Sequence, residues 1–308
     1  MSDQPEAFRR SSGFAATDPA IYYDSLTPAS GASKPPLVLL HGSGHSGACY
    51  LSTPDGRDGW AQQFAALGFP VLVPDWPGVG RSGRVDFADL TGELVCRALG
   101  AFIDSLDQPC VLLTHSMSGA YGWKLVETHG RRIRAVIGIA PSPPGNQEPV
   151  PEIVGRGEGY VIVRRGIFDR RVNLNAPTPF DDDLVERKLI GGAPQFPHDF
   201  LEAYKRSLRA APPRLTYERS NIDGSQLRIT NTAPFTDKPV LVVSAPHDPD
   251  HTPDNDGALA RWFGEIGADA DYWYLPDQGI DGNGHMMMLE KNNSDIAVRI
   301  AGWIDEKI

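Results

Sequence analysis

Cysteine, positive charge and long apolar runs are all scarce in this chain of 308 residues. Its three cysteines, Cys49, Cys96 and Cys110, are widely spaced and odd in number, which argues against a disulfide framework and favours a reducing compartment. The formal net charge of -10 argues against a surface that binds nucleic acid. No apolar run approaches the length that spans a bilayer. We therefore expect neither nucleic acid nor a membrane as a partner.

The sequence also lacks internal repeats, low-complexity tracts and a charged start followed by an apolar stretch. The last absence indicates that there is no secretory signal, and with the unpaired cysteines it predicts a cytoplasmic protein. A hydrophobic content of 41% and a charged content of 22% are typical of a soluble globular protein. The length allows one large core with an insertion. Assembly into a homo-oligomer is left open.

Short apolar runs alternate with helical patterns along most of the chain. The runs lie at 37–40, 71–73, 111–113, 135–139, 240–243 and 272–275, and the helical patterns lie at 60–67, 87–106, 116–128, 258–266 and 295–304. This alternation predicts an α/β protein with a mostly parallel central sheet and helices on both faces. Before the first run, Ile21-Tyr22-Tyr23 is expected to form an edge strand, and residues 1 to about 20 are expected to be loosely ordered.

The alternation stops between residues 141 and 238. This stretch opens with a proline-rich segment and holds helix candidates at 181–189 and 198–208. It is too long to be a loop in a compact domain. We interpret it as a largely helical cap inserted into the core. The chain then divides into a first core part (1–140), the cap (141–238) and a second core part (239–308).

Ser116 lies where an apolar strand meets a helical pattern. The run Val111-Leu112-Leu113 leads into Thr114-His115-Ser116-Met117-Ser118-Gly119, and this arrangement is typical of a nucleophile elbow. The usual pattern has glycine two residues before and two residues after the serine, whereas Thr114 and Ser118 stand here. Both are small, as the sharp turn requires. The alternative is a serine that merely caps a helix.

Two further segments supply the groups that a serine nucleophile needs. Leu40-His41-Gly42-Ser43-Gly44 ends a buried strand, so the backbone N–H groups of Ser43 and Met117 are expected to bind an oxyanion. His285, in a loop after the last strand, is the expected general base because imidazole titrates near neutral pH.

An acid is needed to orient the base. Asp248 follows the strand at 239–243 and is the expected triad acid. Asp250 is its main competitor and Asp281 is a weaker one. The charged loop at 247–251 also resembles a metal cluster, but its proline and its lack of helical ligand spacing favour a loop with one functional carboxylate.

The order Ser116, Asp248, His285 is that of an α/β-hydrolase, and the chain resembles this superfamily over residues 20–140 and 239–308. The loop at 75–82 looks like the family's Asp-x-x-Gly-x-Gly-x-Ser turn. The segments at 53–56 and 282–286 are similar to those of bacterial serine carboxylesterases with an inserted cap. That group often carries its acid just after the strand that follows the nucleophile helix. Because residues 138–141 hold no acid here, the departure favours Asp248.

The resemblance implies an α/β-hydrolase fold and a serine hydrolase that cleaves a small-molecule carboxylic ester through an acyl-enzyme. No metal or organic cofactor is expected. The segment Gly78-x-Gly80-x-x-Gly83 also fits a dinucleotide fingerprint, but the following residues read as loop instead of helix. Lactone, amide or C–C bond hydrolysis and hydroxynitrile cleavage are alternatives on the same scaffold. A receptor with little turnover is an alternative of another class.

Overall fold

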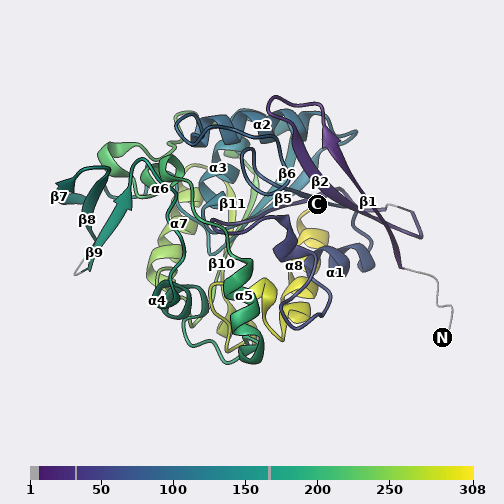
Figure 1. Ribbon diagram of the computed structural model, residues 1–308. Helices are drawn as coiled ribbons and strands as arrows, with labels where there is room; N and C mark the ends of the chain where they lie inside the picture. Colours follow the sequence, from purple (N-terminus) through teal and green to yellow (C-terminus); the bar gives the residue numbers. More distant parts are fainter. Residues whose placement is uncertain (1–6, 32, 166–167) are drawn as a thin grey trace.

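An eight-stranded sheet forms the centre of the protein in a computed structural model that describes residues 7–31, 33–165 and 168–308 (Figure 1). The strand order is β1-β2-β4-β3-β5-β6-β10-β11. The strands β1 and β2 pair antiparallel with their neighbours, and all other pairs are parallel, as the alternation predicts. The strands are β1 (Phe8–Ala15), β2 (Ile21–Pro28), β3 (Leu37–Leu40), β4 (Val71–Pro74), β5 (Cys110–His115), β6 (Ile133–Ile139), β10 (Pro239–Ser244) and β11 (Asp269–Tyr274).

The first strand contradicts the expected loose N-terminal region for residues 8–15. β1 pairs with the whole of β2, from Phe8 opposite Pro28 to Ala15 opposite Ile21, so that β1 and not β2 forms the edge. Its side chains are mostly exposed, and Phe14 is 63% exposed. Backbone pairing holds this strand in place with little apolar burial, which is why its sequence carries no strand pattern.

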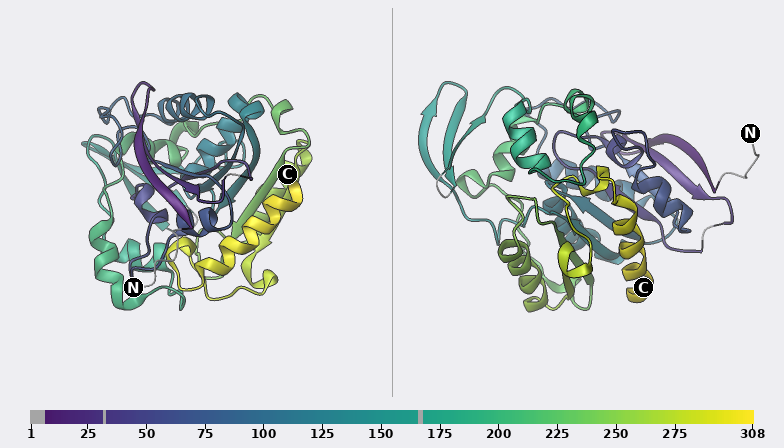
Figure 2. Two further views of the ribbon diagram at one scale, coloured as in Figure 1. Left: turned by 90° about the vertical axis from the view of Figure 1, so that its right-hand side faces the viewer. Right: turned by 90° about the horizontal axis from the view of Figure 1, so that it is seen from below.

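Helices cover both faces of the sheet (Figures 1 and 2). One face packs against α1 (Trp60–Ala66) and α8 (Asn293–Lys307). The other packs against α2 (Gly92–Asp104), α3 (Ser118–His129) and α7 (Pro253–Glu265). Because successive side chains of a strand point to opposite faces, Leu37 and Leu39 enter the first core and Val38 and Leu40 enter the second. Short turns of 3-10 helix join these elements: η1 (Gly47–Tyr50), η2 (Gly130–Arg132), η7 (Leu275–Gln278) and η8 (Met287–Leu289).

The inserted segment (residues 141–238) contains strands that the sequence pattern did not predict. A three-stranded antiparallel sheet of β7 (Glu152–Gly157), β8 (Tyr160–Arg165) and β9 (Phe168–Asn173) stands out at one end of the molecule (Figure 1). Val161, Val163 and Val172 face one side of it and pack against Ile222. Few of the described side chains of these strands are buried, which explains why the three strands have only a weak apolar alternation.

Helical elements make up much of the rest of the inserted segment. The predicted helices at 181–189 and 198–208 are confirmed as α4 with the π-helix η3, and as η4 with α5. The elements are α4 (Asp182–Leu184), η3 (Val185–Ile190), η4 (His198–Phe200), α5 (Leu201–Ser207), α6 (Pro213–Arg219), η5 (Ile222–Gly224) and η6 (Ala233–Phe235). That the segment is a separate cap domain stays a prediction. None of the helices in the described ranges is long and apolar enough to cross a bilayer.

Candidate active site

Ser116 lies in a strained turn between β5 and α3. Its φ angle is +53°, in the left-handed region that costs a non-glycine residue on the order of 1–3 kcal/mol. Backbone hydrogen bonds hold it there: its N–H donates to the Ile139 carbonyl at 3.0 Å, and its own carbonyl accepts from Ser142 at 2.8 Å and Gly119 at 2.9 Å. Ser116 is partly exposed between buried neighbours, so the turn presents its hydroxyl at the surface of the core.

The two residues that replace glycine in the elbow are both accommodated. The Ser118 hydroxyl donates to the His41 carbonyl at 2.6 Å and accepts from the Trp76 indole N–H at 3.1 Å. The close backbone approach falls one residue later, because a Cβ on Gly119 would stand 2.6 Å from the Cβ of Pro141. Ser118 therefore ties the start of α3 to the loop after β3, a contact that a glycine could not make.

His285 links Ser116 to Asp248. Its Nδ1 lies 2.6 Å from Asp248 Oδ2 and its Nε2 lies 3.0 Å from Ser116 Oγ. With the proton on Nδ1, Nε2 is free to accept from the serine hydroxyl. The side chains of His285 and Asp248 are 1% and 0% exposed. Burial disfavours the charged form of Asp248, but the charges of His285 and His251 outweigh it and hold the pKa of Asp248 well below its usual range.

The competing acids serve other contacts. Asp250 is half-exposed and forms an ion pair with Lys188 of the inserted segment. Asp281 accepts the N–H of Gly282 at 2.7 Å. Within the described ranges, Asp248 is the carboxylate that hydrogen-bonds to His285. His285 itself lies in a turn before η8, while α8 begins only at Asn293.

The loop after β3 lies against the elbow. A Cβ on Gly42 would stand 3.0 Å from the Cβ of Ser116, and the N–H groups of Ser43 and Met117 have no hydrogen-bond partner among the residues that the structure describes. The loop is held from behind, because Gly47 donates to Asp75 Oδ1 at 2.7 Å. The two N–H groups that we expect to bind an oxyanion therefore lie beside Ser116. One is on the loop after β3 and the other is on the elbow.

Three further histidines surround this loop and are neutral near pH 7. Burial lowers the pKa of His41 and of His45 to about 4, and it lowers the pKa of His115 well below the usual value. His45 donates from Nδ1 to the Ser43 carbonyl at 2.9 Å, and His115 donates from Nε2 to the His285 carbonyl at 3.0 Å. They shape the backbone around the site, as the sequence position of His41 and His45 suggests.

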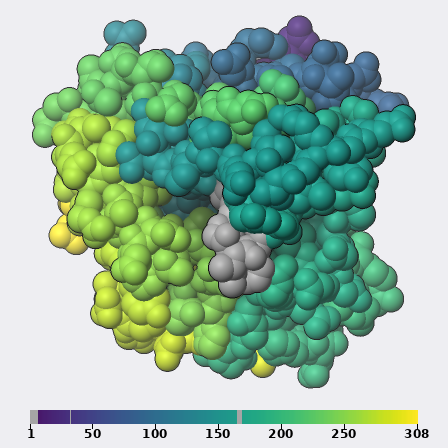
Figure 3. Space-filling model, turned by 90° about the vertical axis from the view of Figure 1, so that its left-hand side faces the viewer, coloured from purple at the N-terminus to yellow at the C-terminus, as the bar shows by residue number. Residues whose placement is uncertain are grey.

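The inserted segment also contacts the loop after β3. The Tyr204 hydroxyl donates to His45 Nε2 at 3.1 Å, and the Arg209 N–H donates to the Gly44 carbonyl at 2.8 Å. A Cβ on Gly44 would stand 2.6 Å from the ring of Phe180. The same segment meets the loop that carries His285, because the backbone N–H of its Gln195 donates to the Gly282 carbonyl at 3.1 Å. Figure 3 shows a hollow where the teal and yellow-green surfaces meet.

Comparison with known proteins places the chain in a family. A family profile described as "Alpha/beta hydrolase family" matches residues 37–298. This chain belongs to the alpha/beta hydrolase family. It is 26% identical to a fungal protein named "Probable secreted lipase phiG" over 345 aligned positions, which cover 93% of this chain and 86% of that protein. It is 28% identical to a 2-hydroxy-6-oxononadienedioate/2-hydroxy-6-oxononatrienedioate hydrolase of Cupriavidus pinatubonensis, over 60% of this chain and 65% of that protein.

Solved structures with the same fold include two hydrolases. A novel bacterial esterase superposes with a TM-score of 0.59 at 18% identity, covering 97% of this chain and 93% of its own. A serine hydrolase of carbazole degradation superposes with a TM-score of 0.61 at 15% identity, covering 96% of this chain and 99% of its own. These likenesses establish the α/β-hydrolase fold.

The glycine-rich loop of this α/β-hydrolase surrounds a carboxylate. A Cβ on Gly80 would stand 2.3 Å from Asp75 Oδ2, and Arg81 donates to the same oxygen from its backbone N–H at 2.8 Å and from Nε at 2.9 Å. Helix α2 begins only at Gly92. The glycines therefore let the loop wrap around Asp75, and α2, the next helix along the described chain, does not open within the motif as a pyrophosphate site would require.

Asp248, His251 and His285 bring one possible ligand atom each to within 4.8 Å of one another. The 2.6 Å contact between His285 Nδ1 and Asp248 Oδ2 is shorter than the spacing of about 3.3 Å between two ligands of a tetrahedral cation. It has the length of a charge-assisted hydrogen bond. We therefore interpret this cluster as a hydrogen-bonded group and not as a metal centre.

Glu290, which no sequence motif singled out, supports the loop that carries His285. The Glu290 carboxylate accepts the N–H of Gly284 at 2.7 Å and the side chain of Asn283 at 2.5 Å. Burial is the main reason that the pKa of Glu290 is raised to about 7. Met286, Met287 and Met288 are fully buried in the core, so this run of methionines fills the core. A glutamate five residues after a candidate base is the one weak signal that the sequence offered.

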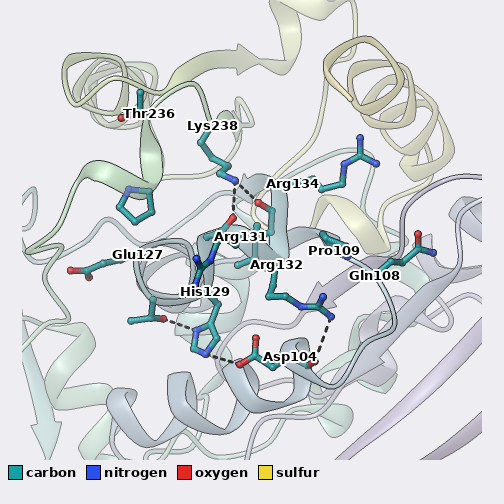
Figure 4. Close-up of a pocket in the computed structure, with 14 residues that line it drawn as sticks. Asp104, Gln108, Pro109, Glu127, His129, Arg131, Arg132, Arg134, Thr236 and Lys238 are labelled. Atoms are coloured by element: carbon teal, nitrogen blue, oxygen red, sulfur yellow. Dashed lines mark hydrogen bonds and ion pairs between the residues drawn. The ribbon is translucent and has the colours of Figure 1, made fainter.

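A cavity of about 910 Å³ lies at the opposite edge of the sheet (Figure 4). It is lined where β5 and β6 begin, whereas Ser116 follows the carboxyl end of β5. Two of its basic side chains form hydrogen bonds with backbone carbonyls. Lys238 donates to the Gly130 and Ile133 carbonyls, and Arg132 donates to the carbonyl of Leu106. Backbone carbonyls thus engage Lys238 and Arg132, and the residues that line the cavity do not include Ser116, His285 or Asp248.

Proposed function

We propose that this α/β-hydrolase is a serine hydrolase that cleaves a small-molecule carboxylic ester. Ser116 attacks the ester carbonyl, and His285 takes the serine proton at Nε2 and later gives it to the leaving alcohol. Asp248 holds the imidazole tautomer and stabilises the imidazolium. The N–H groups of Ser43 and Met117 bind the oxyanion, and water then cleaves the acyl-enzyme.

The observation that carries this proposal is the continuous hydrogen-bond path from Ser116 through His285 to Asp248. Both distances, 3.0 Å and 2.6 Å, fall in the range that a nucleophile and its base require. The strained φ angle of Ser116 adds support, because strain of this kind collects at active sites. Each oxyanion donor is expected to lower the barrier by about 2.7–4 kcal/mol.

The ester class is supported by the printed names of several relatives, which include a lipase and an esterase. C–C bond hydrolysis is the second candidate, because the chain is 28% identical to a 2-hydroxy-6-oxononadienedioate hydrolase over 205 aligned positions. The same Ser116–His285 pair would serve either reaction. The two candidates differ in the substrate that the enzyme turns over.

An activity panel with a nucleophile variant tests the proposal. The purified protein is assayed on short p-nitrophenyl esters, lactones, amides and a 2-hydroxy-6-oxo-dienoate, and it is labelled with a fluorophosphonate. We expect ester turnover, labelling at Ser116, and a loss of roughly a millionfold in kcat for Ser116→Ala. Ser105→Ala, at the end of α2, is the matched control and should keep full activity. Unchanged ester turnover by Ser116→Ala would refute the proposal.

A further inference from the structure

A second buried histidine–carboxylate pair lies directly beside the first. His251 Nδ1 is 3.2 Å from Asp256 Oδ1 and 3.3 Å from Asp256 Oδ2, and both residues are 4% exposed. Asp256 lies in the first turn of α7, where Thr252 is the N-cap. The cap and the first turn of this helix therefore fix the carboxylate against His251.

His251 is connected to both partners of the Asp248–His285 pair. Its backbone N–H donates to Asp248 Oδ1 at 3.3 Å, on the carboxylate oxygen that does not bind His285. Its ring stacks on the ring of His285, with the centroids 5.4 Å apart and the planes inclined by 29°. The ring of His115 lies on His285 as well, with a centroid distance of 4.8 Å. A charge on His251 would thus act on His285 over a short distance between two buried rings.

The charges around His251 favour its protonated form. Burial opposes the charge, but the carboxylates of Asp256 and Asp248 outweigh burial and raise the pKa of His251, while Lys188 of the inserted segment opposes them more weakly. Asp250 adds a further negative charge nearby. His45 and His115, the other histidines whose charges bear on this group, are held neutral by burial. Among the histidines around His285, His251 is therefore the one whose protonated form its surroundings favour.

We propose that His251, paired with Asp256, is a positioning residue that keeps His285 unprotonated to lower pH and so sets the acidic limit of the hydrolase reaction. The inference rests on the proposed function, in which His285 must be neutral to accept the Ser116 proton. A cation stacked 5.4 Å from His285 disfavours a second cation there. Asp256 offsets part of this repulsion, so the charged pair as a whole should move the acidic limb by less than the His251 cation alone would.

The test is the pH dependence of kcat/KM in two variants. His251→Gln should move the acidic limb upward by about one pH unit, because it removes the cation and leaves Asp256 unpaired. The double variant H251Q/D256N replaces the pair by two neutral, hydrogen-bonding side chains and should move the limb in the same direction by less. Asp254→Asn is the matched control: this exposed residue lies on the same helix and also loses a negative charge, and its pH profile should not change.

A structural role alone would lower kcat at every pH and leave the acidic limb in place. Folded variants with such a profile, or with a limb moved downward, would overturn the inference. NMR titration of the His285 imidazole in the Ser116→Ala background gives a readout that needs no turnover, and there the H251Q midpoint should also rise. Loss of the proposed function would appear separately, as a wild-type protein that neither hydrolyses esters nor reacts with a fluorophosphonate.

Discussion

Gly191 lies against the carbonyl oxygen of His247: a Cβ on this glycine would stand 1.8 Å from that oxygen. Gly191 ends the π-helix η3 with a φ angle of +62°, and His247 begins the loop that carries Asp248. The inserted segment is therefore fitted to the acid loop at atomic contact, and the ion pair of Lys188 with Asp250 lies beside this point. The position of the inserted segment and the position of Asp248 depend on each other.

Gly191→Ala should displace the acid loop. The added methyl group has no room against His247, so we expect a loss of more than about 2 kcal/mol in the free energy of unfolding and a clear fall in kcat for the ester reaction. Gly192→Ala is the matched control, since Gly192 also has a positive φ angle of +73° but has no atom within 4 Å of its Cβ position. It should cost only about 1 kcal/mol and keep kcat. Equal losses in both variants, measured by urea unfolding, would contradict the fit.

Asp248→Asn should lower kcat by about ten thousandfold, because the amide no longer stabilises the imidazolium and can hold the wrong tautomer. Asp250→Asn should leave kcat within a fewfold of the wild type, since Asp250 contacts Lys188 and not His285. Steady-state kinetics with a p-nitrophenyl ester separates the two. A larger effect at position 250 than at position 248 would make Asp250 the triad acid.

Ser118→Gly restores the usual elbow pattern but should destabilise this protein. The His41 carbonyl loses a hydrogen-bond donor and the Trp76 indole N–H loses its acceptor, both in a buried site. A loss of about 1–3 kcal/mol is expected in the free energy of unfolding. Trp76→Phe in the same background removes the unpaired N–H. The double variant should therefore lose less unfolding free energy than the two single variants lose together. A neutral or stabilising Ser118→Gly would show that the hydroxyl contributes nothing.

Phe180→Ala should change the choice of substrate. Its ring packs on Gly44 of the loop that carries Ser43, so the smaller side chain should favour esters with a longer acyl chain by about tenfold in kcat/KM relative to acetate. Phe200→Ala is the control, because Phe200 is 42% exposed to solvent. The ratio of kcat/KM for octanoate and acetate esters measures the effect. An identical ratio in both variants would show that Phe180 does not affect the choice of acyl chain.

Glu290 should make the protein less stable as the pH rises toward neutrality. The pKa of Glu290 is raised to about 7, against 4.5 for a free side chain, so the folded state binds this proton more tightly than the unfolded state. The resulting stabilisation is complete below about pH 4.5 and is lost as the pH rises to about 7, a difference of roughly 3 kcal/mol. Glu290→Gln should flatten the pH dependence of urea unfolding in that range. Glu306→Gln, an exposed change on α8, should leave the slope as in the wild type.

The sheet could be predicted from the sequence because buried parallel strands are read as short apolar runs. Residues 37–40 and 111–113 are of this kind, and both lie in adjacent central strands. The outermost strand β1 and the small sheet of β7, β8 and β9 carry little buried apolar surface, so their residues gave no comparable signal.

A cytoplasmic location stays an untested prediction, and assembly into a homo-oligomer stays open.

Part of the candidate site could be predicted from the order of its motifs along the chain. Ser116 and the loop with Ser43 each follow directly after a recognisable strand, His285 lies in a loop beyond the last strand, and the parallel arrangement brings strand ends together. Asp248 and Asp250 are two residues apart and have the same side chain. Burial separates them: Asp248 lies inside with His285, and Asp250 lies at the surface with Lys188.

The amino-acid sequence by itself determined the family and the layered α/β core, and it singled out Ser116 and His285 as candidates, because strand patterns and turn residues are local properties. The choice of Asp248 over Asp250 rests on burial in the tertiary structure. The tertiary structure decided which side chains share a buried environment. Four contacts show this. His251 stacks on His285, and the Glu290 carboxylate supports the loop that carries His285. The Ser118 hydroxyl lies between His41 and Trp76, and Gly191 fits against His247. Such contacts depend on the distance between side chains in the folded protein, and the spacing of residues along the chain does not predict that distance.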